Sequence, residues 1–159
     1  AMTGLRLGYV AVQDARTRSI VNGWCSWFYT LDKVSEDEVL RNTAFAAEHL
    51  RPFGIERIVS SPYVRCVESV EPLSAHLVRP LLIHDDLAEN MDAKAAALVD
   101  VDGEEVVLLC SHGDVVPALL EVLAPKADLG RDPKCEKGST WVIERGGRSA
   151  RYLPPPDLG

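Results

Sequence analysis

The sequence predicts an α/β protein, a three-layer sandwich in which a mainly parallel central sheet is flanked by helices. Residues 106–110 form an apolar run that begins with β-branched side chains, which is typical of a strand buried on both faces. Residues 111–114 interrupt this run, and from Val115 apolar residues recur at helical spacing. Strand and helix patterns alternate in this way along the chain, which indicates parallel strands joined by helices. A chain of 159 residues can bury its own core, so we expect a single domain over residues 1–159.

The beginning of the chain is predicted to hold one strand and one irregular segment. Residues 5–12 are apolar and partly β-branched, which favours a first strand that ends before Gln13. The pair Asn22-Gly23 predicts a turn. Residues 24–29 hold a dense group of aromatic side chains with two interpretations. They form either a loop packed on the core or an exposed surface that binds a protein partner.

A unit of helix, strand and helix is predicted next. Residues 35–38 are a capping box that begins a helix, and this helix is expected to end near Pro52. Residues 55–59 predict the second strand, and residues 63–77 predict the helix that follows it. Pro72 is expected to kink or divide this second helix because proline lacks an N–H group.

Shorter elements complete the predicted sheet. Residues 81–84 predict a third strand, and residues 92–99 predict an alanine-rich helix whose first residue, an aspartate, acts as the cap. Residues 140–144 and 149–153 predict a terminal hairpin. The Gly146-Gly147 pair suits a two-residue turn between these last strands.

Composition and charge narrow the classes of partner. The net charge of −7 argues against nucleic acid or an anionic membrane surface, because neither attracts an acidic protein. No apolar run approaches the roughly 18 residues of a membrane-spanning helix. The cysteines are widely spaced without a C-x-x-C pair, which predicts reduced thiols and a cytoplasmic location. They are Cys25, Cys66, Cys110 and Cys135.

Polar side chains are expected to gather at one edge of the sheet. Gln13 and Asp14 follow the first predicted strand. Arg65 lies in the first turn of the helix after the second strand, and His112 follows the central strand. The carboxyl ends of parallel strands meet at one edge, where α/β proteins bind ligands. His112 also borders a helix N-terminus that favours an anion, although a histidine satisfied within a strand-to-helix turn is the alternative.

Several segments, in order, resemble the histidine phosphatase superfamily, the fold shared by cofactor-dependent phosphoglycerate mutases and phosphohistidine phosphatases. These segments are residues 58–69, 71–73, 87–89 and 111–114. Residues 137–142 also resemble the closing strand of small histidine phosphatase domains that some bacteria fuse to Nudix hydrolases. The resemblance implies a phosphoglycerate mutase-like fold and a bacterial phosphatase that needs no cofactor.

The resemblance also implies roles for individual residues. Members of the family carry a nucleophilic histidine and a phosphate-binding arginine after the first strand, where this chain has Gln13 and Asp14. Arg65 matches the phosphate clamp of the family. His112 matches the histidine that faces the phosphoryl group, and Glu89 matches the proton donor to the leaving group. Both phosphohistidine-forming groups are therefore expected to be missing.

These departures favour a degenerate phosphatase that acts through binding, either of a weakly held phosphate or phosphoester or of a protein partner at residues 24–29. In this hypothesis Asp14 pairs with Arg65 and fills the pocket. The alternative is an active phosphomonoesterase or phosphohistidine phosphatase, with Asp14 as an altered nucleophile. A third hypothesis is a metal site of Asp14, Glu89 and His112, against which the positive charge of Arg65 argues.

Overall fold

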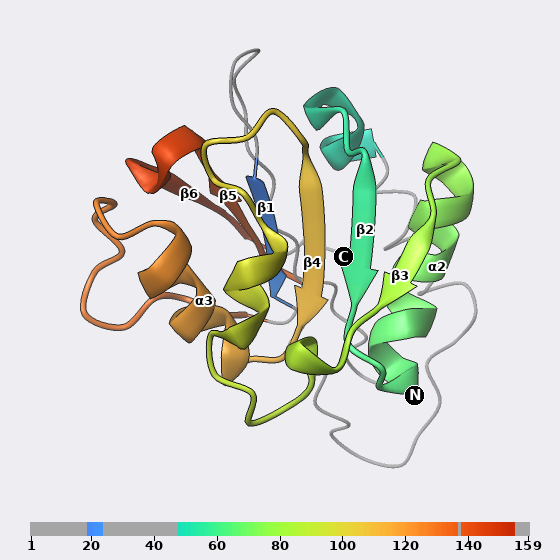
Figure 1. Ribbon diagram of the computed structural model, residues 1–159, viewed down its shortest axis with the longest axis horizontal. Coiled ribbons are helices and arrows are strands. Elements are labelled where there is room, and N and C mark those ends of the chain that lie inside the picture. Colours follow the sequence, from blue (N-terminus) through green and yellow to red (C-terminus); the bar gives the residue numbers. More distant parts are fainter. Residues whose placement is uncertain (1–18, 24–47, 137, 155–159) are drawn as a thin grey trace.

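The computed structural model describes residues 19–23, 48–136 and 138–154 (Figure 1). The described strands form one six-stranded sheet in the order β3-β2-β4-β1-β5-β6. The strands are β1 (Ser19–Gly23), β2 (Arg57–Ser60), β3 (Leu81–Ile83), β4 (Val107–Ser111), β5 (Thr140–Ile143) and β6 (Ala150–Leu153).

The sheet is mainly parallel. β3, β2, β4 and β1 pair in parallel, whereas β5 is antiparallel to β1, and β6 is antiparallel to β5. The register aligns Gly23 with Ser111 and Ser60 with Cys110. The carboxyl ends of β1, β2 and β4 therefore reach the same edge of the sheet. The predicted α/β fold with a mainly parallel sheet is confirmed.

Helices α2 (Val64–Leu77) and α3 (Val115–Leu123) directly follow the turns after β2 and β4. Residues 48–50 are helical and lead into the 3-10 helix η1 (Arg51–Phe53), close to the predicted helix end. The other 3-10 helices are η2 (Asp85–Leu87), η3 (Lys94–Leu98) and η4 (Arg145–Gly147). Within the described ranges, no helix has the length and apolar character needed to cross a membrane.

Both faces of β4 are covered, since every residue of this strand is buried. The Sγ atom of Cys110 lies 3.8 Å from the carbonyl oxygen of Cys66 in α2. The next residue, Ser111, donates from Oγ to the carbonyl oxygen of Leu87 in η2, at 2.7 Å. Successive side chains of a strand point to opposite faces, so α2 covers one face and η2 the other. The apolar run of the sequence is thus the buried centre of the molecule.

The aliphatic core keeps the loop after β4 in place. Leu108 and Leu109 of β4 are fully buried, as are Leu119 and Leu120 of α3. Burial of one such side chain contributes about 1.5–3 kcal/mol. The strand and helix on either side of the segment 111–114 are therefore both anchored in the core.

The predicted turn at Asn22-Gly23 is wrong, because both residues belong to β1. Asn22 pairs with Cys110 of β4, and Val21 pairs with Trp141 of β5. Hydrogen bonding to strands on both sides outweighs the local turn preference of an Asn-Gly pair. The strand predicted at residues 5–12 and the capping box lie outside the described residues.

Two local predictions also need correction, and for a third the structure excludes one of its two alternatives. Residues 94–98 form a 3-10 helix without a side-chain cap, and Asp92 lies before it in a left-handed conformation. The last two strands are joined through η4 and not by a two-residue turn, with φ values of 71° at Gly146 and 60° at Gly147. Pro72 lies inside α2 without dividing it. A proline removes only one hydrogen bond, and the packing of α2 on the sheet maintains the helix.

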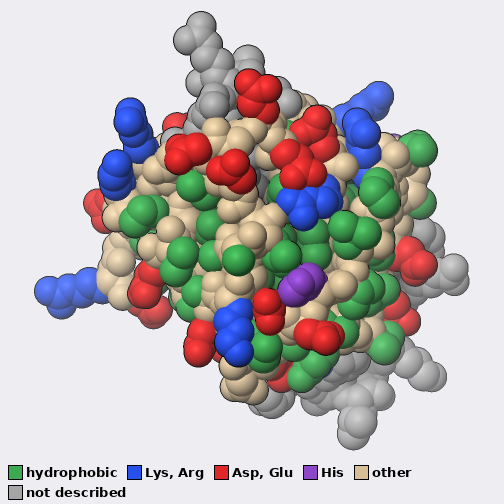
Figure 2. Space-filling view, in the orientation of Figure 1, with side chains coloured by type: hydrophobic (Ala, Val, Ile, Leu, Met, Phe, Trp, Pro, Cys, Tyr) green, Lys and Arg blue, Asp and Glu red, His purple; other side chains and the backbone are tan. Residues whose placement is uncertain are grey.

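Acidic side chains gather at the edge of the sheet where β4 begins. The exposed members of the preceding segment are Asp100, Asp102, Glu104 and Glu105. Figure 2 shows this concentration of acidic groups in the upper part of the face that it displays. Arg57, at the start of β2, bonds to Glu105 through Nη2 and Oε2 at 2.7 Å. This edge repels anions and is opposite to the edge where the parallel strands end.

Candidate functional site

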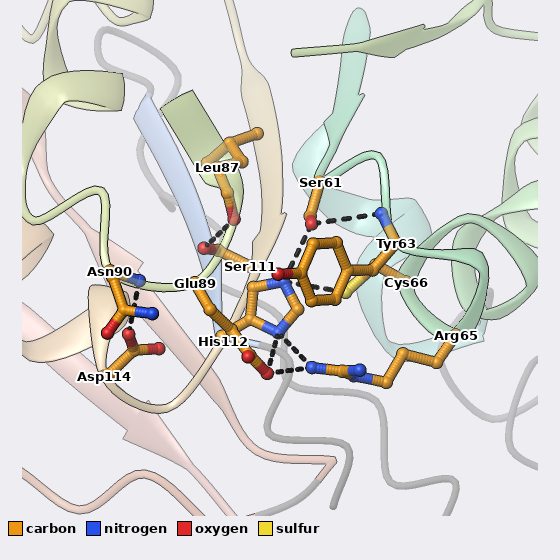
Figure 3. A network of polar contacts seen from close by, with 10 residues as sticks. All are labelled: Ser61, Tyr63, Arg65, Cys66, Leu87, Glu89, Asn90, Ser111, His112 and Asp114. Carbon is orange, nitrogen blue, oxygen red and sulfur yellow. Dashed lines mark hydrogen bonds and ion pairs between the residues drawn. The ribbon is translucent and has the colours of Figure 1, made fainter. Parts of the chain in front are cut away.

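A polar network lies at the carboxyl ends of the parallel strands (Figure 3). Ser61 follows β2, and Arg65 lies in the first turn of α2. Glu89 follows η2, and His112 follows β4. Each side chain comes from a connection whose ends are held by the sheet, which brings residues far apart in the sequence into one network.

His112 is the buried centre of this network, with 3% of its surface exposed. Its Nε2 atom lies 2.7 Å from Oγ of Ser61, and its Nδ1 atom lies 3.1 Å from Nη2 of Arg65. A guanidinium can only donate, so Nδ1 accepts and the ring proton is assigned to Nε2, which donates to Ser61. The carbonyl oxygen of His112 accepts from the N–H groups of Val115 and Val116, each at 3.0 Å. Both the backbone and the ring of His112 are therefore held in place.

Arg65 is held by Glu89 and Tyr63. Its Nη2 atom donates to Oε1 of Glu89, and this carboxylate oxygen is 3.5 Å from Nδ1 of His112. The Cζ atom of Arg65 lies 4.7 Å from the ring centre of Tyr63, within range of a cation–π contact. The Tyr63 ring also meets the His112 ring edge to face, with centres 4.8 Å apart. The Nε atom of Arg65 is buried and has no hydrogen-bond partner among the described residues.

The thiol of Cys66 lies near the Nε2 atom of His112, away from the Nδ1 atom that faces Arg65. The Sγ atom of Cys66 is 3.7 Å from Nε2 of His112. Burial raises the pKa of Cys66, but hydrogen bonds from Cys110, His112 and Ser61 and the charge of His112 together lower this pKa to about 6. Burial and the neighbouring Cys66 raise the pKa of Cys110. Donors around Cys66 therefore favour its thiolate.

The structure brings three of the predicted site residues together, namely Arg65, Glu89 and His112. The pairing of Arg65 with Glu89 was not predicted from the sequence. Gln13 and Asp14 lie outside the described residues, so the predicted Asp14–Arg65 pair stays a prediction. The aromatic segment 24–29 also lies outside them. Within the described ranges no cluster of His, Cys, Asp or Glu is arranged to hold a metal ion.

Ser61, Tyr63 and Cys66 belong to the site, although the sequence reasoning did not select them. All three flank Arg65 in the turn and first helical turn after β2. Their nearness to Arg65 in the sequence was the available signal. Which of them face His112 depends on the tertiary position of α2, which local sequence patterns do not specify.

The strand beside β4 ends at Gly23, which is aligned with Ser111, the residue before His112. In this fold the resemblance places a nucleophile after the first strand. If residues 5–12 form the first strand, as their sequence predicts, that place belongs to Gln13 and Asp14. In the described sheet, the end of β1 at Gly23 lies beside the end of β4. Gln13 and Asp14 lie outside the described residues, so their assignment to this place stays a prediction. Residues 19–29 contain no histidine or arginine, so both assignments lack these groups.

The geometry agrees with a match to a known family. Residues 37–98 match the model of the histidine phosphatase superfamily, branch 1. The chain belongs to the histidine phosphatase superfamily. The matched range includes Arg65 and Glu89 and ends before His112.

Individual known proteins are also similar to this chain. An 8-oxo-(d)GTP phosphatase of Mycolicibacterium smegmatis is 30% identical over 118 residues, which make up 68% of this chain and 37% of that protein. A protein assigned as phosphohistidine phosphatase SixA from Agrobacterium tumefaciens superposes with a TM-score of 0.55 at 15% identity, covering 93% of this chain and 98% of that chain. The corresponding protein from Nakamurella multipartitia superposes with a TM-score of 0.57 at 17% identity, covering 95% of this chain and 94% of that chain. At these identities the structural likeness shows a shared fold.

Proposed function

We propose that this member of the superfamily is a catalytically impaired phosphatase that binds a phosphorylated ligand at Arg65 and His112 and acts through binding. The observation that carries the proposal is that the Arg65 guanidinium is only partly hydrogen-bonded. Its Nη2 atom is engaged by Glu89, whereas its buried Nε atom has no partner among the described residues. A buried donor without an acceptor destabilises a protein by about 1–3 kcal/mol, so this position favours a ligand that supplies an oxygen.

Phosphate fits this arrangement. Nε and Nη2 are the side-on pair of donors with which an arginine grips two oxygens of one phosphate or carboxylate. Glu89 occupies one of these donors, so a phosphoryl group would have to displace it. The acidic segment 100–105 is at the opposite edge of the sheet, which leaves the Arg65 edge as the favourable approach for an anion.

Impaired catalysis is proposed because His112 is the only histidine that the described residues bring to the site. The family reaction needs an imidazole that accepts the phosphoryl group and releases it to water. His84 also follows a parallel strand, but its Nδ1 atom accepts the N–H of Asp86 at 3.2 Å and caps η2. Neither Gln13-Asp14 nor residues 19–29 supply a replacement histidine.

The ligand class is proposed to be a phosphomonoester or nucleotide. The relative named as an 8-oxo-(d)GTP phosphatase motivates the nucleotide, and the fold motivates phosphohistidine as a further test compound. Titration calorimetry with inorganic phosphate, guanosine nucleotides and phosphohistidine tests binding. We expect weak binding that is lost in Arg65→Ala and kept in Arg57→Ala, the matched control with an arginine at the acidic edge. Equal binding by wild type and Arg65→Ala would exclude the proposed site.

An active phosphatase is the second candidate, because Glu89 lies beside His112 where a proton donor would act. Phosphomonoester turnover by the wild-type chain, abolished in both His112→Ala and Asp14→Ala, would establish this alternative. A variant with Asp14→His and Gln13→Arg is the comparison that restores both family groups at the predicted place. Turnover only in that variant would support the impaired phosphatase.

A protein partner at residues 24–29 is a separate proposal, and it rests on their aromatic composition. Sedimentation compares the mass of the wild-type protein with that of a Trp27→Ala, Phe28→Ala variant. A loss of self-association or of partner capture in the variant supports an interaction surface. Unchanged behaviour supports a loop packed on the domain.

A further inference from the structure

Two hydrogen bonds join the segment after β4 to the loop that carries Glu89 (Figure 3). Ser111 Oγ donates to the carbonyl oxygen of Leu87 at 2.7 Å. Asp114 Oδ2 accepts the backbone N–H of Asn90, also at 2.7 Å. His112 lies between the two bonds on the segment 111–114, and Glu89 lies between them on the segment 87–90. The pair of bonds therefore brackets the contact between these site residues.

Asp114 makes an unusual use of its carboxylate. It occupies the N-cap position of α3, where an aspartate ordinarily accepts an N–H group of its own helix. Here the side chain makes no such capping bond. The N–H groups of Val115 and Val116 bond instead to the carbonyl oxygen of His112. The Asp114 carboxylate is thereby free to bind the Glu89 loop.

The partner of Asp114 lies in a left-handed turn. Asn90 has a φ of 64°, in the left-handed region that asparagine adopts more readily than most residues other than glycine. This residue directly follows Glu89, so its conformation helps to fix the position of the Glu89 backbone. A bond to the N–H of Asn90 stabilises that conformation.

We propose that Asp114 is a positioning residue, which holds Glu89 against Arg65 through Asn90 and so sets how strongly Glu89 competes with a phosphoryl ligand. This inference rests on the proposed function, in which Arg65 receives the ligand. Loosening the loop releases Glu89 from Arg65 and makes Arg65 more available. Asp114 is itself exposed, so its replacement leaves the core intact.

Calorimetry with inorganic phosphate tests the proposal. Asp114→Ala is expected to bind phosphate about two- to tenfold more tightly, which corresponds to the loss of one ordinary hydrogen bond. Asp114→Asn keeps an acceptor oxygen and is expected to bind like the wild type. Asp128→Ala is the matched control, since Asp128 also accepts a backbone N–H, that of Gly130, in an exposed loop.

Repeating the Asp114→Ala substitution in a Glu89→Gln protein tests whether Asp114 acts through Glu89 or only keeps the site rigid. In Glu89→Gln the competing charge is absent, so adding Asp114→Ala is expected to change phosphate affinity less than it does in the wild type. Equal changes in both backgrounds, or no change in either, would overturn the role of Asp114. Phosphate binding that does not respond to Arg65→Ala would instead overturn the proposed function.

A measurement without ligand tests Asp114 independently of phosphate. The side-chain carboxyl ¹³C signal of Glu89 is identified by its absence from Glu89→Gln. Asp114→Ala is expected to shift this signal, and Asp114→Asn is expected to leave it in place. An unshifted signal in Asp114→Ala would overturn the inference even if phosphate does not bind.

Discussion

The Nη2 atom of Arg65 lies 3.1 Å from Nδ1 of His112, which places a permanent donor against one ring nitrogen. The neutral imidazole therefore carries its proton on Nε2, directed at Ser61. Protonation of Nδ1 would turn this contact into a repulsion and would favour Glu89, whose Oε1 is 3.5 Å away. A change of charge on Arg65, Glu89 or His112 therefore alters the interactions of the other two side chains.

Removing the charge of Glu89 should strengthen anion binding. Two like charges about 4 Å apart repel by roughly 1 kcal/mol in water and about 4 kcal/mol at an effective dielectric of 20. We therefore expect Glu89→Gln to bind phosphate at least about fivefold more tightly in calorimetry at low salt. Glu105→Gln, which breaks the pair with Arg57 at the acidic edge, is the control and should have little effect. Weaker binding by Glu89→Gln would mean that Glu89 supports the ligand and does not compete with it.

Ser61→Ala should destabilise the fold. The substitution leaves the buried Nε2–H group of His112 without the acceptor that now lies 2.7 Å away. An unsatisfied buried donor costs about 1–3 kcal/mol, and denaturant unfolding measures this loss. Ser74→Ala removes an exposed hydroxyl that bonds to the carbonyl of Arg79, so it should change stability by less than about 0.5 kcal/mol. Equal stability of both variants would show that another acceptor replaces Ser61, either water or the Sγ atom of Cys66, which lies 3.7 Å from Nε2.

Cys66 should make stability depend on pH. Its pKa in the folded chain is about 6, below the ordinary value of 9.0, so the unfolded chain binds more protons between these values. The stabilisation from the thiolate is fully present above pH 9 and is lost as the pH falls through 6. Ultraviolet thiolate absorbance should show a step near pH 6 that is missing in Cys66→Ser. A step only near the ordinary thiol pKa would contradict the assignment.

Gly147→Ala should be strongly destabilising. Its φ is +60°, and an added Cβ atom would collide with the carbonyl oxygen of Leu123, so the end of α3 would have to move. We expect the free energy of unfolding to fall by about 3 kcal/mol or more, because left-handed strain adds to the displacement of packed backbone. Gly130→Ala is the control, because Gly130 has a φ of +74° but no atom within 4 Å of the added Cβ. Gly130→Ala should lower the free energy of unfolding by only about 1–2 kcal/mol. Thermal melts of the two variants compare these losses.

The sequence indicates the class of fold because apolar runs and helical spacing are local properties. It also indicates that Arg65 and His112 share an edge, since parallel strands end together. It does not indicate the pairing of Arg65 with Glu89, because that contact depends on the left-handed turn at Asn90 and its bond to Asp114. The sequence places a turn at Asn22-Gly23, where pairing with β4 and β5 overrides the local preference. Contacts decided by distant partners are the ones that local patterns miss.

The position of β1 has a consequence for how the chain folds. This strand is inserted between β4 and β5, although most of the described chain separates it from both partners in sequence. When β4 has been synthesised, both of its neighbours, β2 and β1, are therefore already present, whereas the second edge of β1 is covered only after β5 has been synthesised. Until then, β1 keeps one edge available to other chains, which is the situation that promotes aggregation. Non-local pairing of this kind also slows folding, so chaperones that shield exposed strand edges should raise the yield of this protein.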